Sequence, residues 1–188
     1  MRIGSSIVFG ISALGVAAVL LAGCSKPQVE TYIIPPMPPR LKAPDHWREV
    51  ATSATMSSEK QRFEIELALE EGNATALATL TVLPGKGDMT REEYLRINVN
   101  RWRGQLGMDT LREEESLDDH ISPVAGMPET ARLVDVNGTL IQPPFLPSRT
   151  VGVLVPRVNA LWVYKLSGHP EVVGQERDEF IQLLPGWR

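Results

Sequence analysis

The chain has 188 residues and a formal net charge of −4 at pH 7, which excludes a nucleic-acid binder that works through bulk positive charge. With 43% hydrophobic and 22% charged residues, the composition is that of a globular domain and excludes a wholly disordered, collagen-like or multi-spanning membrane chain. The single cysteine, Cys24, excludes an internal disulfide and a cysteine-rich metal cluster.

The N-terminus has the features of a secretion signal. Arg2 is positively charged, and the uncharged run from Ile7 to Ala22 is shorter than the roughly 20 apolar residues of a transmembrane helix. The run ends in Leu-Ala-Gly-Cys at residues 21–24, which resembles the lipobox of bacterial lipoproteins. This resemblance implies cleavage of the signal peptide 1–23, a diacylglycerol on the Cys24 thiol and a new amine open to acylation. The alternative is an uncleaved anchor or an ordinary secretory signal.

A lipobox implies attachment to a bacterial membrane. Two or three acyl chains anchor a protein durably, because each buried methylene contributes about 0.8 kcal/mol. We therefore expect a lipid-anchored protein of the cell envelope. Ser25 follows the cysteine where, by resemblance to the sorting rule of Gram-negative lipoproteins, an Asp would favour the inner membrane. If the cell is Gram-negative, this resemblance implies, as a hypothesis, the periplasmic face of the outer membrane.

A proline-rich segment follows the cysteine, from Ser25 to Pro44. Closely spaced prolines exclude a helix and favour an extended, semi-rigid polyproline II spacer. We therefore assign residues 24–45 to a lipidated Cys and a tether, and residues 46–188 to a single globular domain. The alternative for the proline-rich segment is a ligand for an aromatic groove on a partner protein.

The first half of the domain predicts a hairpin followed by a helix. Apolar residues alternate over 62–69 and 74–83, on either side of a turn signal at 70–73. Thr90 and Glu93 form a capping-box signature before residues at helical spacing. One face of this helix carries a continuous apolar stripe, formed by Leu95, Val99, Trp102 and Leu106.

The second half predicts a loop, more strands and a last helix. Residues 109–128 are acidic and irregular, and we expect a solvated loop. Asn137-Gly138 indicates a hairpin turn. Strands are expected at 130–136, 150–155 and 161–167, with a turn at 157–159 and a helix at 171–184. In the last strand, core and rim positions account for Trp162, Tyr164 and Lys165. These elements predict an α+β fold with a mainly antiparallel sheet flanked by helices.

The order of the elements resembles the PsbP/Mog1-like fold, most closely at the end, where the strand LWVYKLSG at 161–168 precedes the helix EVVGQERDEFIQLL at 171–184. Residues 98–107 also resemble a signature of uncharacterised bacterial envelope proteins. The resemblance implies an α/β/α sandwich. It implies no reaction, because the family includes photosystem subunits, transport adaptors and lipoproteins of unknown role.

Polar side chains line one flank of the helix that follows the capping box. Tyr94, Asn98, Arg101 and Gln105 recur at i, i+4, i+7 and i+11. They offer donors and acceptors but no base that titrates near neutral pH, so they suit binding of a carboxylate, phosphate or peptide better than proton transfer. The alternative is that Asn98, Arg101 and Gln105 tie the helix end to carbonyls of the acidic loop.

Motifs for catalysis, metals and cofactors are absent from the sequence. His46, His120 and His169 are far apart, and His120 beside Asp118 and Asp119 is best explained by a solvated loop. We therefore expect no metal, no cofactor and no nucleic acid, and a binding or scaffold module whose partner is an envelope protein or a small anionic or peptide ligand. The alternative is a small envelope hydrolase or accessory enzyme near the 94–105 helix, which would use Glu64, Glu66, Arg101 and a loop histidine.

Overall fold

The computed structural model describes residues 37–52, 58–70 and 72–184, all within the compact unit Ile33–Arg188. The predicted signal peptide, Cys24 and most of the predicted tether lie outside these residues. Each helix of the described part is too short or too polar to cross a membrane.

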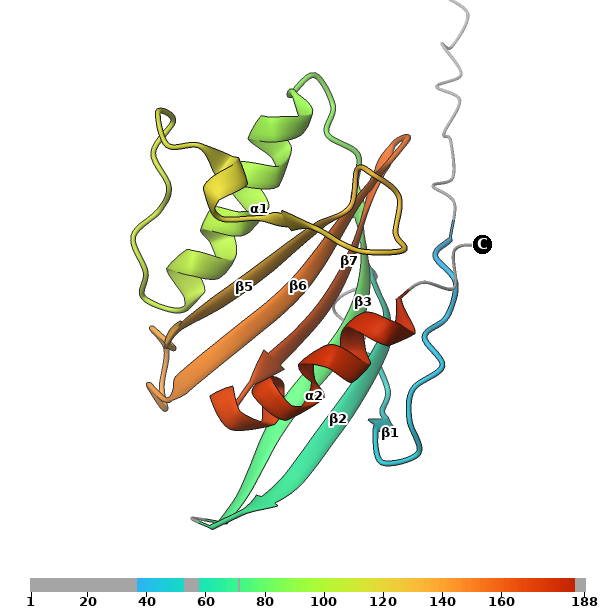
Figure 1. The fold of residues 1–188 in the computed structure, drawn as a ribbon, viewed down its shortest axis with the longest axis vertical. Helices are drawn as coiled ribbons and strands as arrows, with labels where there is room; N and C mark the ends of the chain where they lie inside the picture. Colours follow the sequence, from blue (N-terminus) through green and yellow to red (C-terminus); the bar gives the residue numbers. More distant parts are fainter. Residues whose placement is uncertain (1–36, 53–57, 71, 185–188) are drawn as a thin grey trace, which may run out of the picture. The chain divides into compact units, whose positions relative to one another are not determined.

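The strands form one seven-stranded sheet in the order β1-β2-β3-β7-β6-β5-β4, in which every pair of neighbours is antiparallel (Figure 1). Their bounds are β1 Arg48–Glu49, β2 Glu59–Leu69, β3 Gly72–Pro84, β4 Ser122–Pro123, β5 Arg132–Thr139, β6 Pro147–Arg157 and β7 Ala160–Gly168. The last strand in the chain, β7, lies between β3 and β6 and joins the two halves of the sheet.

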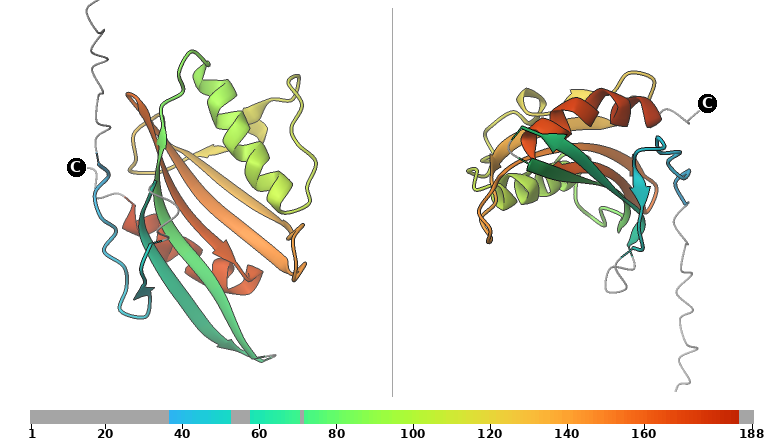
Figure 2. Two further views of the ribbon diagram at one scale, coloured as in Figure 1. Left: turned by 180° about the vertical axis from the view of Figure 1, so that it is seen from behind. Right: turned by 90° about the horizontal axis from the view of Figure 1, so that it is seen from below.

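Two helices, α1 (Arg91–Gln105) and α2 (Pro170–Leu183), cover opposite faces of the sheet (Figure 2). Successive residues of β7 show this arrangement. Leu161 and Val163 belong to the core that contains α1, whereas Trp162 and Tyr164 belong to the core that contains α2. The predicted α+β fold, an antiparallel sheet between helices, is confirmed.

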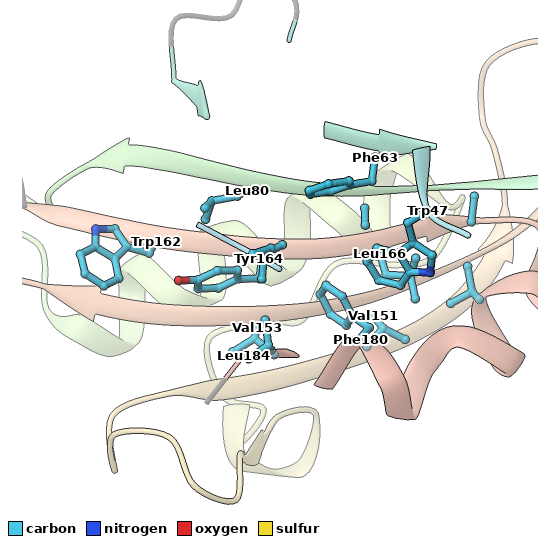
Figure 3. Packing of buried hydrophobic residues seen from close by; sticks show 14 of the residues in the cluster. Trp47, Phe63, Leu80, Val151, Val153, Trp162, Tyr164, Leu166, Phe180 and Leu184 are labelled. Carbon is cyan, nitrogen blue, oxygen red and sulfur yellow. The ribbon is translucent and has the colours of Figure 1, made fainter. Parts of the chain in front are cut away.

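The core on the α2 side includes residues from the N-terminal end of the domain. The Trp47 ring lies 6.1 Å from the Phe63 ring and 6.4 Å from the Phe180 ring between centroids (Figure 3). Leu41 is 6% exposed, and its N–H donates to Oε1 of Gln61 at 2.6 Å. Residues 37–45 are the described end of the segment that we expected to be a tether. They pack on the domain instead, because Leu41 is buried in the core on the α2 side.

The core on the α1 side confirms the predicted cap and apolar stripe. Thr90 Oγ1 accepts from the Glu93 N–H at 3.2 Å, and Glu93 Oε2 accepts from the Thr90 N–H at 2.6 Å. A side chain at Gly152 of β6 would overlap the Trp102 ring, so this glycine makes room for the indole. The four stripe residues Leu95, Val99, Trp102 and Leu106 are all buried.

The hairpin turn predicted at Asn137-Gly138 is wrong. Both residues lie inside β5, where they pair with Arg149 and Ser148 of β6, and the connection between the strands comes later. A Cβ at Gly138 would overlap the carbonyl of Leu106 at the end of α1, and the Thr139 N–H donates to that carbonyl at 3.0 Å. Gly138 therefore does not form a turn. It allows the end of α1 to pack closely on β5.

The description of residues 109–128 as a solvated loop is also incomplete. The segment contains a short 3₁₀ helix, Leu117–Asp119, and the strand β4. Leu111, Leu117 and Ile121 are buried in the α1-side core. Apolar residues spaced irregularly among acidic ones show no helix or strand period, so their burial depends on the surface that α1 and β5 provide.

Candidate functional site

Helix α1 packs over β5 and β6. Beside it, the same face of the sheet has a cleft over β3 and β7. Thr79 of β3 pairs with Lys165 of β7, so both side chains lie on the α1 side of the sheet, as Val163 does. A cleft of about 170 Å³ runs between these strands and the flank of α1. We call it the cationic cleft. Its polar lining residues are Ser58, Thr79, Thr81, Arg101, Gln105 and Lys165.

The four polar residues predicted along α1 divide into two roles. Arg101 and Gln105 line the cationic cleft. Asn98 is buried, donates from Nδ2 to the Tyr94 carbonyl at 2.8 Å and accepts at Oδ1 from Nη2 of Arg101 at 3.1 Å. Tyr94 donates its hydroxyl to the carbonyl of Pro84. Burial raises the pKa of Tyr94. Asn98 therefore orients Arg101, and Tyr94 joins α1 to the end of β3.

The alternative expectation, that this flank ties the helix to the acidic loop, is wrong for the contacts of Asn98 and Arg101. The ties come from other positions on the helix. Arg96, Asn100 and Arg103 donate to the backbone carbonyls of Arg112, Leu111 and Asp109 at 2.7, 3.1 and 2.8 Å. The guanidinium of Arg101 is therefore left on the side of the cleft.

Lys165, for which the sequence predicts a core or rim position without a function, lines the cationic cleft. It lies on β7 between apolar neighbours and is partly buried. Burial, and then the charge of Arg101, lower the pKa of the Lys165 amine, while Glu59 acts in the opposite direction. The one available signal in the sequence is a lysine within the apolar run LWVYKLS, on the face of the strand that alternates with the buried aromatic residues.

The cationic cleft carries more positive than negative charge. Near the cleft, Nε and Nη2 of Arg62 donate to Oε1 and Oε2 of Glu59 at 3.0 Å each, so the charges of these two residues largely cancel. Among the described residues that line the cleft, Arg101 and Lys165 are charged and no carboxylate is present. Two neighbouring cations in a partly buried cleft create a positive potential that attracts anions.

The carboxylates considered for an enzyme lie elsewhere. Glu64 pairs with Arg48, and Glu66 accepts from Nδ2 of Asn73 at 2.6 Å. Both line a separate cleft of about 490 Å³ at the edge of the sheet, together with His46. Arg101 does not line that cleft, so the described structure does not bring the four proposed catalytic groups together.

Side chains that could ligate a metal gather on the other face of the sheet. In the described part of the chain they are His46, Glu176 and Glu179, whose ligand atoms all lie within 4.8 Å of one another. His120, Asp118 and Asp119 do not form such a group. Residue spacing could not indicate this set, because His46 and Glu176 are 130 positions apart.

No protein-family model and no curated protein matches the chain. Among solved structures, it is similar to the crystal structure of LpqN, a protein involved in cell envelope biogenesis of Mycobacterium tuberculosis. The two are 18% identical with a TM-score of 0.41, over 78% of this chain and 79% of LpqN. This similarity assigns neither a family nor a function, and the PsbP/Mog1-like resemblance stays a prediction.

Proposed function

We propose that this chain is a lipid-anchored binding module of a bacterial cell envelope, and that its cationic cleft takes a small anion or the anionic group of a peptide. The lipobox-like residues 21–24 support the anchor. The chemistry of the cleft supports the class of ligand.

The observation that carries the proposal is the juxtaposition of Arg101 and Lys165 in one small cleft. Their mutual repulsion costs free energy that an anion placed between them offsets. The guanidinium, the ammonium, the Gln105 amide and the hydroxyls of Thr79 and Thr81 supply donors for the ligand's oxygens. The cleft is smaller than the 300 to 1,000 Å³ typical of pockets for drug-sized ligands, so it suits a carboxylate or phosphate group.

The same lining favours binding over catalysis. General acid–base chemistry needs a titratable group within about 3 Å of the reacting proton. Lys165 is the one titratable group of that kind among the described residues that line the cationic cleft, and no histidine, cysteine or carboxylate lies beside it there to exchange a proton. The alternative enzyme would have to use the separate cleft that His46, Glu64 and Glu66 line. There the two carboxylates already have partners, Arg48 and Asn73.

Thermal unfolding of the full-length chain in detergent, with and without inorganic phosphate at constant ionic strength, tests this proposal. A ligand at ten times its dissociation constant stabilises the folded state by about 1.4 kcal/mol. We expect phosphate to raise the melting temperature of the parent, and Arg101→Gln and Lys165→Met to remove most of that rise.

Lys42→Met and Arg91→Gln are matched controls, because both residues are exposed and lie outside the cationic cleft. They should respond to phosphate as the parent does. An equal response in all five proteins would mean that phosphate acts on the whole surface, and the proposed site would be wrong. Acylation of Lys165 by an amine-reactive reagent, followed by mass spectrometry, gives a second measurement, since a bound anion should slow it.

A further inference from the structure

His46, Glu176 and Glu179 lie together where the N-terminal segment of the domain meets α2. Glu176 and Glu179 are three positions apart on the helix, so they share one face. The Nε2 atom of His46 lies 3.0 Å from Oε2 of Glu176, and the ligand atoms of all three residues lie within 4.8 Å of one another. Two segments distant in the sequence thus supply an imidazole and two carboxylates to one point.

Glu176 is an unusual carboxylate in this set because it is 6% exposed. Its described hydrogen-bond partners are His46 and the indole N–H of Trp47, the latter at 2.8 Å, and no described arginine or lysine forms an ion pair with it. A buried carboxylate is costly unless a cation or several donors compensate its charge. His46 compensates this charge only when its imidazole is protonated, and a metal ion at the open side of Glu176, where His46 and Glu179 lie, would compensate it instead.

Trp47 adds a contact typical of metal centres. Carboxylates that ligate a metal are usually held by a hydrogen bond from an outer residue, which fixes their orientation. The Trp47 indole donates to the same Glu176 oxygen that faces His46, and its ring is fixed between Phe63 and Phe180 (Figure 3). The Glu176 carboxylate is therefore held in place before any ion arrives.

We propose that His46, Glu176 and Glu179 bind a divalent transition metal ion of the Zn²⁺ type, and that the ion clamps the segment around His46 onto α2. An imidazole with two carboxylates suits Zn²⁺, whereas Mg²⁺ and Ca²⁺ prefer oxygen ligands alone. Tetrahedral ligands about 2.1 Å from zinc lie roughly 3.4 Å apart. His46 and Glu176 are already near that spacing, and the exposed Glu179 side chain is free to turn inward.

The clamp would act on the connection between the domain and the chain before it. The segment holding His46 also contains Leu41 and Trp47, which are both buried in the α2-side core. A metal ion would add a bond that resists peeling of this segment from α2. This site is independent of the cationic cleft, because α1 and α2 lie on opposite faces of the sheet (Figure 2).

Zinc titration of the full-length chain in detergent, after treatment with a chelator, tests the proposal. All proteins carry Cys24→Ser, so that a free thiol does not bind the metal. We expect one Zn²⁺ per chain by isothermal titration calorimetry, a higher melting temperature, and slower hydrogen exchange in residues 41–47. Mg²⁺ and Ca²⁺ should not reproduce these changes.

Two variants separate ligation from folding. Glu179 is exposed, and its side chain forms no hydrogen bond or ion pair with the described residues, so Glu179→Gln should leave the metal-free melting temperature unchanged. His46→Gln keeps a donor toward Glu176 but removes the imidazole. Each should weaken zinc binding at least about tenfold.

Glu171→Gln and His120→Gln are the controls, since they remove the same kinds of group at exposed or partly exposed positions outside the cluster. Both should bind zinc as the parent does. If Glu179→Gln and His46→Gln also bind as the parent does, or if the parent binds no zinc, the proposal is wrong. Phosphate binding at the cationic cleft is measured separately and does not depend on either outcome.

Discussion

Arg149 of β6 donates two parallel hydrogen bonds to the carboxylate of Asp135 on β5, from Nε to Oδ1 at 2.8 Å and from Nη2 to Oδ2 at 2.7 Å. Nε of Arg177 on α2 adds a third bond to Oδ2 at 3.0 Å. Burial raises the pKa of Asp135, but the hydrogen bonds from the two guanidinium groups outweigh it, so the pKa lies below its ordinary value. These three side chains thus connect two strands and a helix.

We expect Asp135→Asn to lower the free energy of unfolding by about 1 to 2 kcal/mol at pH 7. Because the folded pKa is below the unfolded one, the carboxylate stabilises the fold fully above about pH 5, and this stabilisation is lost as the pH falls through the folded pKa. Urea unfolding of parent and variant from pH 7 down to pH 3 should show the difference shrinking. A constant difference would mean that packing, not charge, accounts for it. Asp88→Asn, at an exposed position, should change little.

Gly152 and Gly104 should respond in opposite directions to the same substitution. A methyl group at Gly152 would overlap the buried Trp102 ring, so we expect Gly152→Ala to destabilise the fold by about 1 to 3 kcal/mol. A methyl group at Gly104, near the end of α1, would project into open space, and Gly104→Ala should stabilise by about 0.5 kcal/mol. Chemical unfolding of both variants measures this. Equal effects would contradict the packing of Trp102 on β6.

Lys165→Met should increase stability at pH 7 by up to about 1 kcal/mol, because it removes a partly buried charge, which we propose serves binding in the cationic cleft. Burial and Arg101 lower the pKa of Lys165, so the folded state holds this proton less tightly than the unfolded state does. The parent should therefore gain stability as the pH rises from the folded pKa towards 10.5, and the variant should lack that gain. Unfolding curves between pH 7 and pH 10 measure both effects. A variant less stable than the parent at pH 7 would contradict the idea that this charge is costly.

The proposed lipid anchor predicts a specific effect of Cys24→Ser in a bacterial host. The parent should take up labelled fatty acid and fractionate with membranes, whereas the variant should take up none and keep its signal peptide. Growth with labelled palmitate, followed by fractionation and mass spectrometry of the N-terminus, measures this. A parent that takes up no label would show that the lipobox resemblance is misleading.

Elements with a regular period were predictable because their signals are local. The strands around Phe63 and Ala78 alternate, and the capping box at Thr90 predicts the start of the helix whose apolar stripe is buried. The hairpin turn predicted at Asn137-Gly138 was wrong because the same dipeptide can form a turn or allow a close backbone contact. Here Gly138 contacts Leu106 at the end of α1, an element distant in the sequence. The prediction of a tether was incomplete at Leu41, because the prolines around this residue do not indicate that it is buried in the core on the α2 side.

By itself, the sequence determined that Tyr94, Asn98, Arg101 and Gln105 share one flank of a helix, since the helical period sets that alignment. Only the tertiary structure decided which of them line a cleft, because β7 brings Lys165 beside Arg101 through pairing with β3. The lipobox-like residues 21–24 are likewise a local signal. The approach of His46 to Glu176, 130 positions away, depends on how the N-terminal segment packs on α2, and that packing follows from the burial of Leu41 and Trp47 rather than from any local pattern.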